Sequence, residues 1–228
     1  LFVQVTATPY VLFLQRRDAT IRPNVPFLLE AGAGYCGGEI FFGSFDPQAN
    51  PPAPPIVLVS DTEAQALGRR QIPRGLSSSI EFFILSAAAR SIADQGWPEK
   101  GFKHLSHPSS FINQHTVVAT HIERHLAEIR RKLRRNESVI EIFASAYREL
   151  QRTVPNPPTL DELLIVADEA VRQADYIKVN SETDVPVYGP RLNFVIGGNI
   201  LGRGLTIDDL LVTYYVREAQ VSQMDTVW

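Results

Sequence analysis

The chain has 228 residues, of which 44% are hydrophobic and 21% are charged, a composition that is ordinary for one large globular domain or two small ones. Its formal net charge of −3 excludes a global electrostatic attraction to nucleic acid, so any such binding must come from a local patch. The single cysteine, Cys36, excludes an internal disulfide framework and suits a reducing cytosol, so we expect a cytoplasmic protein.

The first 100 residues have few regular patterns. A strand candidate opens the chain and runs into Thr6, Thr8 and Pro9; it is too short to span a bilayer and lacks the basic flank of a signal peptide, so we expect no membrane role. Residues 18–55 are rich in Pro, Gly, Asn and Asp and predict an irregular segment. Apolar residues then recur at helical spacing and predict an amphipathic helix near residues 80–95.

From Gly101 onward, helical and strand patterns alternate. Thr159 and Glu162 have the spacing of a capping box at the start of one of these helices. The alternation predicts an α/β fold, in which helices flank a parallel sheet. The predicted strands are residues 104–106, 176–179, 194–196 and 210–216, and the predicted helices start at 113 or 116, at about 137 and at 159.

A glycine-rich loop separates the last two predicted strands. It contains Arg203 and four glycines, namely Gly197, Gly198, Gly202 and Gly204. Open α/β sheets bind ligands at the carboxyl ends of their strands, where glycines let backbone N–H groups approach a phosphate and an arginine can hold it with two donors. The pattern also fits a tight connection in which Arg203 pairs with Asp208 or Asp209, and spacing alone leaves both interpretations open.

Two further clusters need an interpretation. All five histidines fall within residues 104–125, and His121 and His125 have the i, i+4 spacing of zinc ligands on a helix. However, Cys36 is remote and no Glu directly follows His121, so we predict no metal site. The basic run from Arg130 to Arg135 is typical of a solvated helix end, but it would also suit contacts with nucleic-acid phosphates, and the sequence leaves both open.

Four motifs occur in order along the chain: Thr6-Ala-Thr-Pro9, Tyr35-Cys-Gly-Gly-Glu39, Leu105-Ser-His-Pro-Ser109 and the loop from Gly197 to Thr206. Together they resemble the Z1 domain family, found in endonucleases and ATPases of bacterial DNA-processing systems, and the first and last are similar to motifs III and V of superfamily-two helicases. This resemblance implies that residues 101–228 are most of a RecA-like second lobe of the P-loop NTPase and helicase type. Residues 1–17 would be a remnant of lobe one, and residues 18–100 a bridge. Since the first residue is Leu1 and not methionine, we expect a piece of a longer protein.

The resemblance also implies three groups of site residues. The nucleotide would be bound by Gly202, Arg203, Gly204 and Thr206. The nucleic-acid backbone would be contacted by Ser106, His107, Ser109, Gly198 and Asn199. Thr6 and Thr8 would couple the two. Gly198 and Asn199 replace the Thr-Asp of many helicases, and Thr206 replaces an Asp near the ribose in helicases of the DEAD type. The polar residues from Ser106 to Ser109 would equally well satisfy their own turn.

The implied function is an ATP-dependent, helicase-like or translocase-like DNA-processing protein of a restriction or defence system. ATP and magnesium would be cofactors of the parent protein, and DNA and a missing N-terminal RecA-like lobe would be its partners. The sequence contains no P-loop motif and stops before the family's finger-arginine segment, so we expect this chain alone to hydrolyse no ATP and to need no cofactor. Two alternatives stay open: a non-catalytic interaction module, and a metal-dependent nuclease that uses Asp208 or Asp209.

Overall fold

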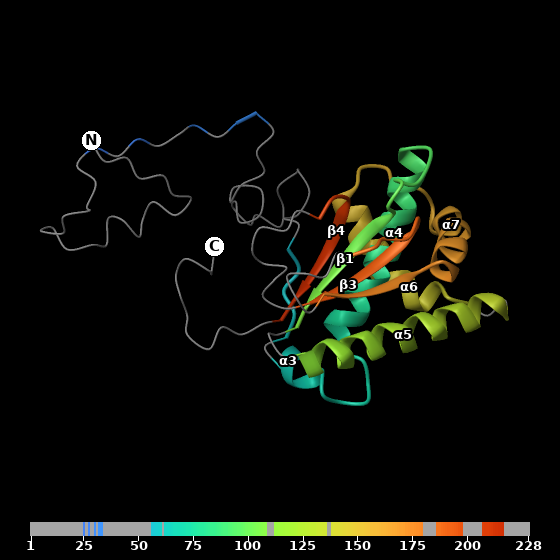
Figure 1. The fold of residues 1–228 in the computed structure, drawn as a ribbon. Helices are drawn as coiled ribbons and strands as arrows, with labels where there is room; N and C mark the ends of the chain where they lie inside the picture. Colours follow the sequence, from blue (N-terminus) through green and yellow to red (C-terminus); the bar gives the residue numbers. More distant parts are fainter. Residues whose placement is uncertain are drawn as a thin grey trace, which may run out of the picture. The chain divides into compact units, whose positions relative to one another are not determined.

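The computed structural model describes residues 56–60, 62–108, 112–135, 138–179, 186–197 and 207–216, together with five residues between 25 and 33 (Figure 1). The ranges from 56 to 216 belong to one compact unit. The predicted strand before Thr6 and the predicted loop residues 198–206 lie outside the described ranges. The division of the chain at residues 17 and 100 stays a prediction.

The sheet has four strands, all parallel, in the spatial order β2-β3-β1-β4. They are β1 (Phe102–His107), β2 (Asp175–Val179), β3 (Leu192–Gly197) and β4 (Leu210–Tyr215). The predicted parallel sheet and its α/β class are therefore confirmed. Each of the four strands predicted from Gly101 onward is present, with ends that differ from the prediction by at most two residues.

The order of the strands makes β1 the partner of both β3 and β4. Ser106 of β1 is the register partner of Ile196 in β3, and His107 is the register partner of Tyr215 in β4. We call the edge where the strands end the carboxyl edge, and the opposite edge the amino edge. Gly197 is therefore at the carboxyl edge, whereas Leu210, the partner of Lys103, begins β4 at the amino edge.

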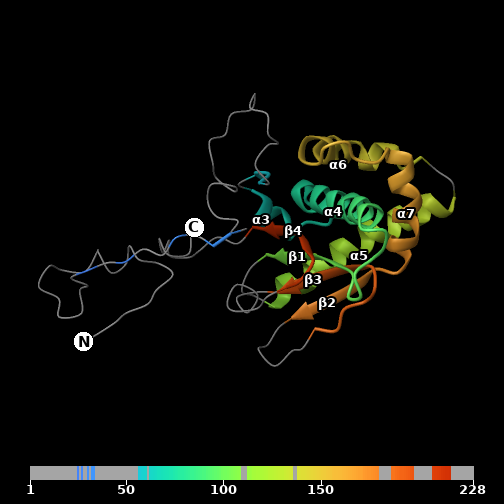
Figure 2. The ribbon, with the colours of Figure 1, turned by 90° about the horizontal axis from the view of Figure 1, so that it is seen from above.

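Five helices accompany the sheet: α3 (Glu63–Ala66), α4 (Arg74–Ala93), α5 (Ile112–Arg134), α6 (Ile140–Thr153) and α7 (Leu160–Arg172). Their buried side chains join one core with those of the sheet face that they cover. α4 packs against β4 and α5 against β3, while α6 and α7 pack on α4. Figure 2 shows the resulting layers, with α4 between α6 and the strands.

α4 differs from the amphipathic helix that the sequence predicts near 80–95. It begins at Arg74, directly after Pro73, and is buried on several sides, because the sheet and two helices pack around it. Its buried residues are Leu76, Ile80, Glu81, Phe83, Ile84, Leu85, Ala87, Ala88, Ala89 and Ser91. In the described part of the chain it is the one helix long and apolar enough to cross a bilayer, and its packing is that of a core helix.

The predicted capping box starts α7. The N–H of Glu162 donates to Thr159 Oγ1 at 3.4 Å, and the N–H of Thr159 donates to Glu162 Oε2 at 2.8 Å. The Thr159 hydroxyl also donates to Glu162 Oε2 at 2.7 Å, and this bond, followed by the one from the Thr159 N–H, lowers the pKa of Glu162 from its ordinary value. At the other end of α7, Arg130 Nε donates to the carbonyl of Val171 at 2.7 Å, so one arginine of the basic run fastens α5 to α7.

The two faces of the sheet have different environments, because side chains alternate along each strand. Phe194 and His104 face the helices, and their rings lie 5.5 Å apart between centroids. The opposite face has a smaller cluster of its own around Leu105, Val179 and Val195, with Tyr188 packed against it. This second face holds the buried Lys103, whose ammonium lies 4.9 Å from the centroid of the Tyr188 ring.

The amino edge is fixed by polar contacts. Asn193, completely buried, donates from its amide nitrogen to the carbonyls of Lys100, Phe102 and Gly189, and accepts from the N–H of Gly189 at 2.7 Å. Lys103 Nζ lies 3.7 Å from Asp209 Oδ2, and the backbone N–H of Lys103 donates to the Asp209 carbonyl at 3.0 Å. An ion pair and a backbone hydrogen bond therefore both attach the start of β4 to β1.

Candidate functional site

The carboxyl edge brings together the described residues of two predicted motifs. Ser106 and His107 end β1, and Gly197 ends the neighbouring β3, although the two segments are far apart in the sequence. The strand pairing thus places the β1 motif beside the point from which the glycine loop starts. The other predicted site residues lie outside the described ranges; they are Thr6, Thr8, Ser109, Gly198, Asn199, Gly202, Arg203, Gly204 and Thr206.

Ser106 lies at this edge with its hydroxyl turned into the core. Its side chain is completely buried, and Oγ lies 3.4 Å from Nδ1 of His104. No surface of the hydroxyl is left for a phosphate. The contact of Ser106 with a nucleic-acid backbone therefore stays a prediction, and the burial of its side chain does not favour it. The alternative, that these polar groups satisfy local needs, agrees better with this arrangement.

His104 connects Ser106 to helix α4. Its Nε2 lies 3.0 Å from Ser79 Oγ, and the Ser79 hydroxyl donates its one proton to the carbonyl of Leu76 at 2.8 Å. His104 must therefore donate from Nε2 to Ser79 and accept at Nδ1 from Ser106. Burial lowers the pKa of His104 to about 3, so the imidazole is neutral and works as a structural link beneath the edge.

Tyr215 is exposed at the edge and packs on the buried His107. The His107 ring is 4% exposed and packs on Tyr215, with 5.0 Å between ring centroids and 42° between planes. Tyr215 itself is 55% exposed. An exposed aromatic ring supported from below is a surface on which a nucleic-acid base can stack. Tyr215 is not among the site residues predicted from the sequence; its position next to the inward-facing Tyr214 in β4 was the signal that could have identified it.

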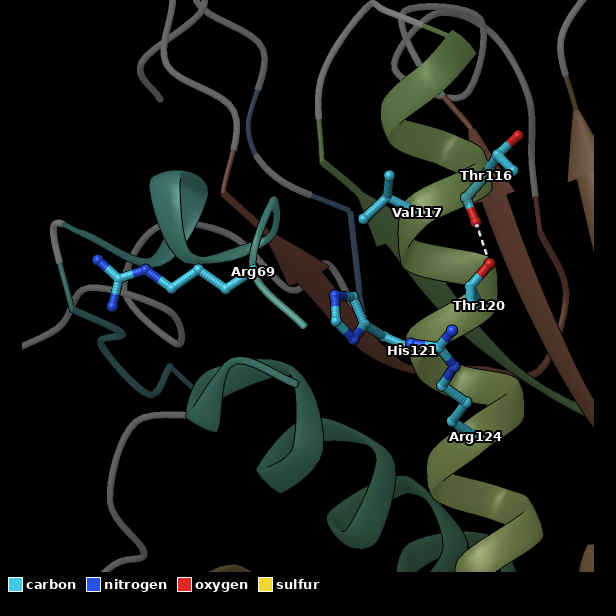
Figure 3. A pocket seen from close by; sticks show the side chains of 6 residues that line it. All are labelled: Arg69, Thr116, Val117, Thr120, His121 and Arg124. Atoms are coloured by element: carbon cyan, nitrogen blue, oxygen red, sulfur yellow. Dashed lines mark hydrogen bonds between the residues drawn. The ribbon is translucent and has the colours of Figure 1, made fainter. Parts of the chain in front are cut away.

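A pocket of about 210 Å³ opens on the first half of α5, the helix that follows β1. It is lined by Arg69, Thr116, Val117, Thr120, His121 and Arg124 (Figure 3). Thr116, Thr120 and Arg124 follow one another at i, i+4 spacing and form one row on the helix. His121 is 4% exposed, and its Nε2 donates to the carbonyl of Leu67 at 3.0 Å, which fastens α5 to the segment carrying Arg69.

Local periodicity does not reveal this pocket, since its two arginines come from segments far apart in the sequence. In the described part of the chain neither Arg69 nor Arg124 has an ion-pair partner. None of the six lining residues is acidic. The pocket is thus a small concave surface with unbalanced positive charge.

The two histidines at zinc-ligand spacing have separate protein partners. His121 bonds to Leu67, and His125 Nε2 lies 3.0 Å from Glu81 Oε1 on α4. Across the described ranges, no group of three or more His, Cys, Asp and Glu residues could hold a metal ion. Asp209, a carboxylate weighed for a nuclease site, lies at the amino edge against Lys103 and away from the carboxyl edge.

The family comparison covers two of the four motifs, those at residues 105–109 and 197–206. The family model described as "Z1 domain" matches residues 75–228. This range contains all four strands, helices α5 to α7 and all of α4 except its first residue. No curated protein and no solved structure gives a significant match to the chain.

Proposed function

Because this chain belongs to the Z1 domain family, we propose that it is part of an ATP-dependent, helicase-like or translocase-like DNA-processing protein. In this proposal the carboxyl edge of the sheet contacts the DNA, and the glycine loop after β3 contacts the nucleotide. Gly202, Arg203, Gly204 and Thr206 hold a phosphate that is shared with an N-terminal lobe, and ATP and magnesium are bound by the complete protein.

One observation carries the proposal: the parallel pairing of β1 with β3 puts two motif-bearing strand ends side by side. Parallel α/β sheets bind ligands outside the carboxyl ends of their strands. The strand end at His107 continues into Ser109 and α5, while the strand end at Gly197 continues into the loop with Gly198 and Asn199. A DNA backbone that follows this edge passes the ends of β3 and β1, and Tyr215 supplies an exposed ring beside the end of β1.

The DNA contact is tested by the anisotropy of a labelled single-stranded oligonucleotide with this chain, between about 50 and 200 mM salt. We expect binding whose affinity falls steeply with salt, because phosphate contacts release counterions. Tyr215→Ala should weaken binding by about five-fold to a hundred-fold, the equivalent of about 1–3 kcal/mol for one stacked base, whereas Tyr215→Phe should keep it.

A matched control is Ile165→Ala, since Ile165 is 76% exposed on α7. This variant should bind as the wild type does. An affinity that is absent, or that does not change with salt, contradicts the proposal and leaves the non-catalytic interaction module as the better interpretation.

The proposed nucleotide contact leads to a separate prediction about ATP hydrolysis. Phosphoryl transfer needs a phosphate cradle, a metal and charge stabilisation together, and the glycine loop would supply only part of this set. We therefore expect no phosphate release from ATP by this chain alone. Steady turnover that Arg203→Ala abolishes would show that the chain contains a complete ATPase site.

A further inference from the structure

We propose that the pocket on α5 binds a phosphate group of the nucleic-acid backbone. That the phosphate belongs to a nucleic-acid strand rests on the proposed function. That the pocket prefers a phosphate rests on the residues that line it. The pocket adds a second contact to the one at the carboxyl edge, carried by residues that none of the four sequence motifs includes.

The size of the pocket selects a small group. Its volume of about 210 Å³ is below the roughly 300–1,000 Å³ of pockets that enclose whole ligands. It corresponds to several water molecules, at about 30 Å³ of liquid volume each. This space suits a phosphate group better than an entire nucleotide.

The charge of the pocket selects an anion. Arg69 and Arg124 are exposed and have no carboxylate partner within the described ranges, so neither guanidinium is neutralised by the protein. An arginine offers a phosphate two parallel donors, and such charge-assisted bonds are about twice as strong as neutral ones. Glu123, next to Arg124 on α5, is exposed but does not line the pocket.

The row on α5 shapes the site. In Figure 3 the guanidinium of Arg124 lies along the helix towards Thr120, and Thr120 donates to the carbonyl of Thr116 at 2.9 Å. This bond fixes the Thr120 side chain against its own helix, with the oxygen still able to accept. Val117 and the buried His121 complete the lining of the pocket on α5.

Arg69 approaches from a different element. Its side chain extends away from α5 in Figure 3, so it must turn to reach a phosphate over the row. The hydrogen bond between His121 and Leu67 holds Leu67 against α5, and Arg69 is two residues further along the chain, so the backbone of Arg69 stays near α5. Turning an exposed arginine costs side-chain entropy but breaks no ion pair of the described residues.

The position of the pocket relates it to the strand end. β1 ends at His107 and α5 begins at Ile112, so the pocket is on the first helix after the carboxyl edge. A DNA backbone that passes His107 and Tyr215 can therefore also reach the first half of α5. The pocket would bind the phosphate regardless of the base attached, which fits a contact that positions a strand without reading its sequence.

The test compares Arg69→Ala/Arg124→Ala with Arg148→Ala/Arg152→Ala. The second pair removes the same charge from α6, where both arginines are exposed. With single-stranded DNA the pocket variant should lose about ten-fold or more in affinity, and its slope of log affinity against log salt should become shallower by about 0.7 per lost phosphate contact. The α6 variant should keep the wild-type slope. Far-ultraviolet circular dichroism confirms that both variants are folded.

A second measurement uses inorganic phosphate as the probe. In nuclear magnetic resonance titrations, phosphate should shift the amide signals of Thr120 and His121 in the wild type but not in the pocket variant, and single-stranded DNA should displace it. Thr120→Val, which keeps the shape of the side chain, should reduce the shift.

The outcomes separate the two proposals. If DNA binds and Tyr215→Ala weakens it, but the pocket variant binds like the α6 variant, the pocket inference is wrong and the proposed function stands. If phosphate shifts the pocket signals and DNA neither binds nor displaces it, the pocket takes a free phosphate and its assignment to nucleic acid is wrong. If neither probe affects Thr120 and His121, the inference fails outright.

Discussion

The carboxylate of Glu63 accepts a hydrogen bond of 3.0 Å from the hydroxyl of Tyr214, a residue 151 positions further along the chain. The same oxygen, Oε1, also accepts from the N–H of Leu76 at 3.0 Å, in the first turn of α4. One buried carboxylate thus joins α3, the start of α4 and the strand β4. Burial, and then the charge and hydrogen bond of Glu63, raise the pKa of Tyr214.

Removing this carboxylate should be costly. Glu63→Ala leaves a buried N–H and a buried hydroxyl without their acceptor, and we expect a loss of about 3 kcal/mol in the free energy of unfolding. Tyr214→Phe removes only one of the two bonds and should cost about 1.5 kcal/mol. Urea denaturation measures both, and Glu63→Gln, which keeps an acceptor oxygen, is the control. Equal losses for Ala and Gln would show that the acceptor is not what matters.

The pair of Lys103 and Asp209 should respond unequally to substitution. Lys103 is 1% exposed and Asp209 is 43% exposed, and burial lowers the pKa of Lys103 despite the neighbouring Asp209. Asp209→Asn leaves the buried ammonium without its counter-charge while suiting the positive φ of 54°. We expect a loss of about 2 kcal/mol, below the roughly 3–5 kcal/mol of a fully buried pair because solvent screens Asp209.

Lys103→Met removes the buried charge and keeps an unbranched chain. It should be neutral or slightly stabilising, because replacement of a buried ion by an apolar group avoids desolvation. Thermal and urea unfolding measure the stabilities of the Lys103→Met and Asp209→Asn variants. A larger loss for Lys103→Met than for Asp209→Asn would contradict the expectation.

His104 should make the protein less stable in mild acid. Its pKa is about 3 in the folded chain against 6.5 for an unperturbed histidine, so between these values the unfolded chain binds a proton that the folded chain does not. The contribution to stability is complete above pH 6.5 and is lost as the pH falls towards 3. Between pH 7 and pH 5 this amounts to about 2 kcal/mol. His104→Gln, which cannot titrate, should show a smaller loss over the same interval, and an identical pH profile would refute the assignment.

Gly101 should tolerate no side chain. Its φ is +57°, and a Cβ there would overlap the backbone oxygens of Arg191 and Gly189, which belong to the segment entering β3. We expect Gly101→Ala to cost about 3 kcal/mol or more in unfolding free energy. Gly96→Ala is the matched control, since a Cβ at Gly96 meets no atom within 4 Å, and its effect should stay within about 0.5 kcal/mol.

Local patterns sufficed for the elements of the described core. The helix predicted to start at residue 113 or 116 is α5, and the pair Thr159 and Glu162 predicted the start of α7, because helical periodicity and capping are decided within a few residues. The alternation of helices and strands predicted the parallel sheet. The strand order was not predictable in this way, since it depends on which strands meet after the chain has folded.

Long-range contacts explain the remaining differences. The helix predicted near residues 80–95 is present as part of α4, but α4 is enclosed by the sheet and two helices and is therefore not amphipathic, which its own sequence cannot show. The hydroxyl of Ser106 turned out to serve His104 and α4, and the pocket depends on the meeting of Arg69 with α5. These contacts join segments whose approach is a property of the tertiary structure.

The central position of β1 has a consequence for synthesis on the ribosome. Both strands that pair with it, β3 and β4, come from residues 192–215, so β1 waits for most of the chain to emerge before either of its sides is covered. Non-local pairing of this kind slows folding and leaves β1 with unpaired backbone groups on both sides in the meantime. Nascent chains stalled before residue 192 should therefore be protease-sensitive and bind chaperones, and release of the last two strands should end both.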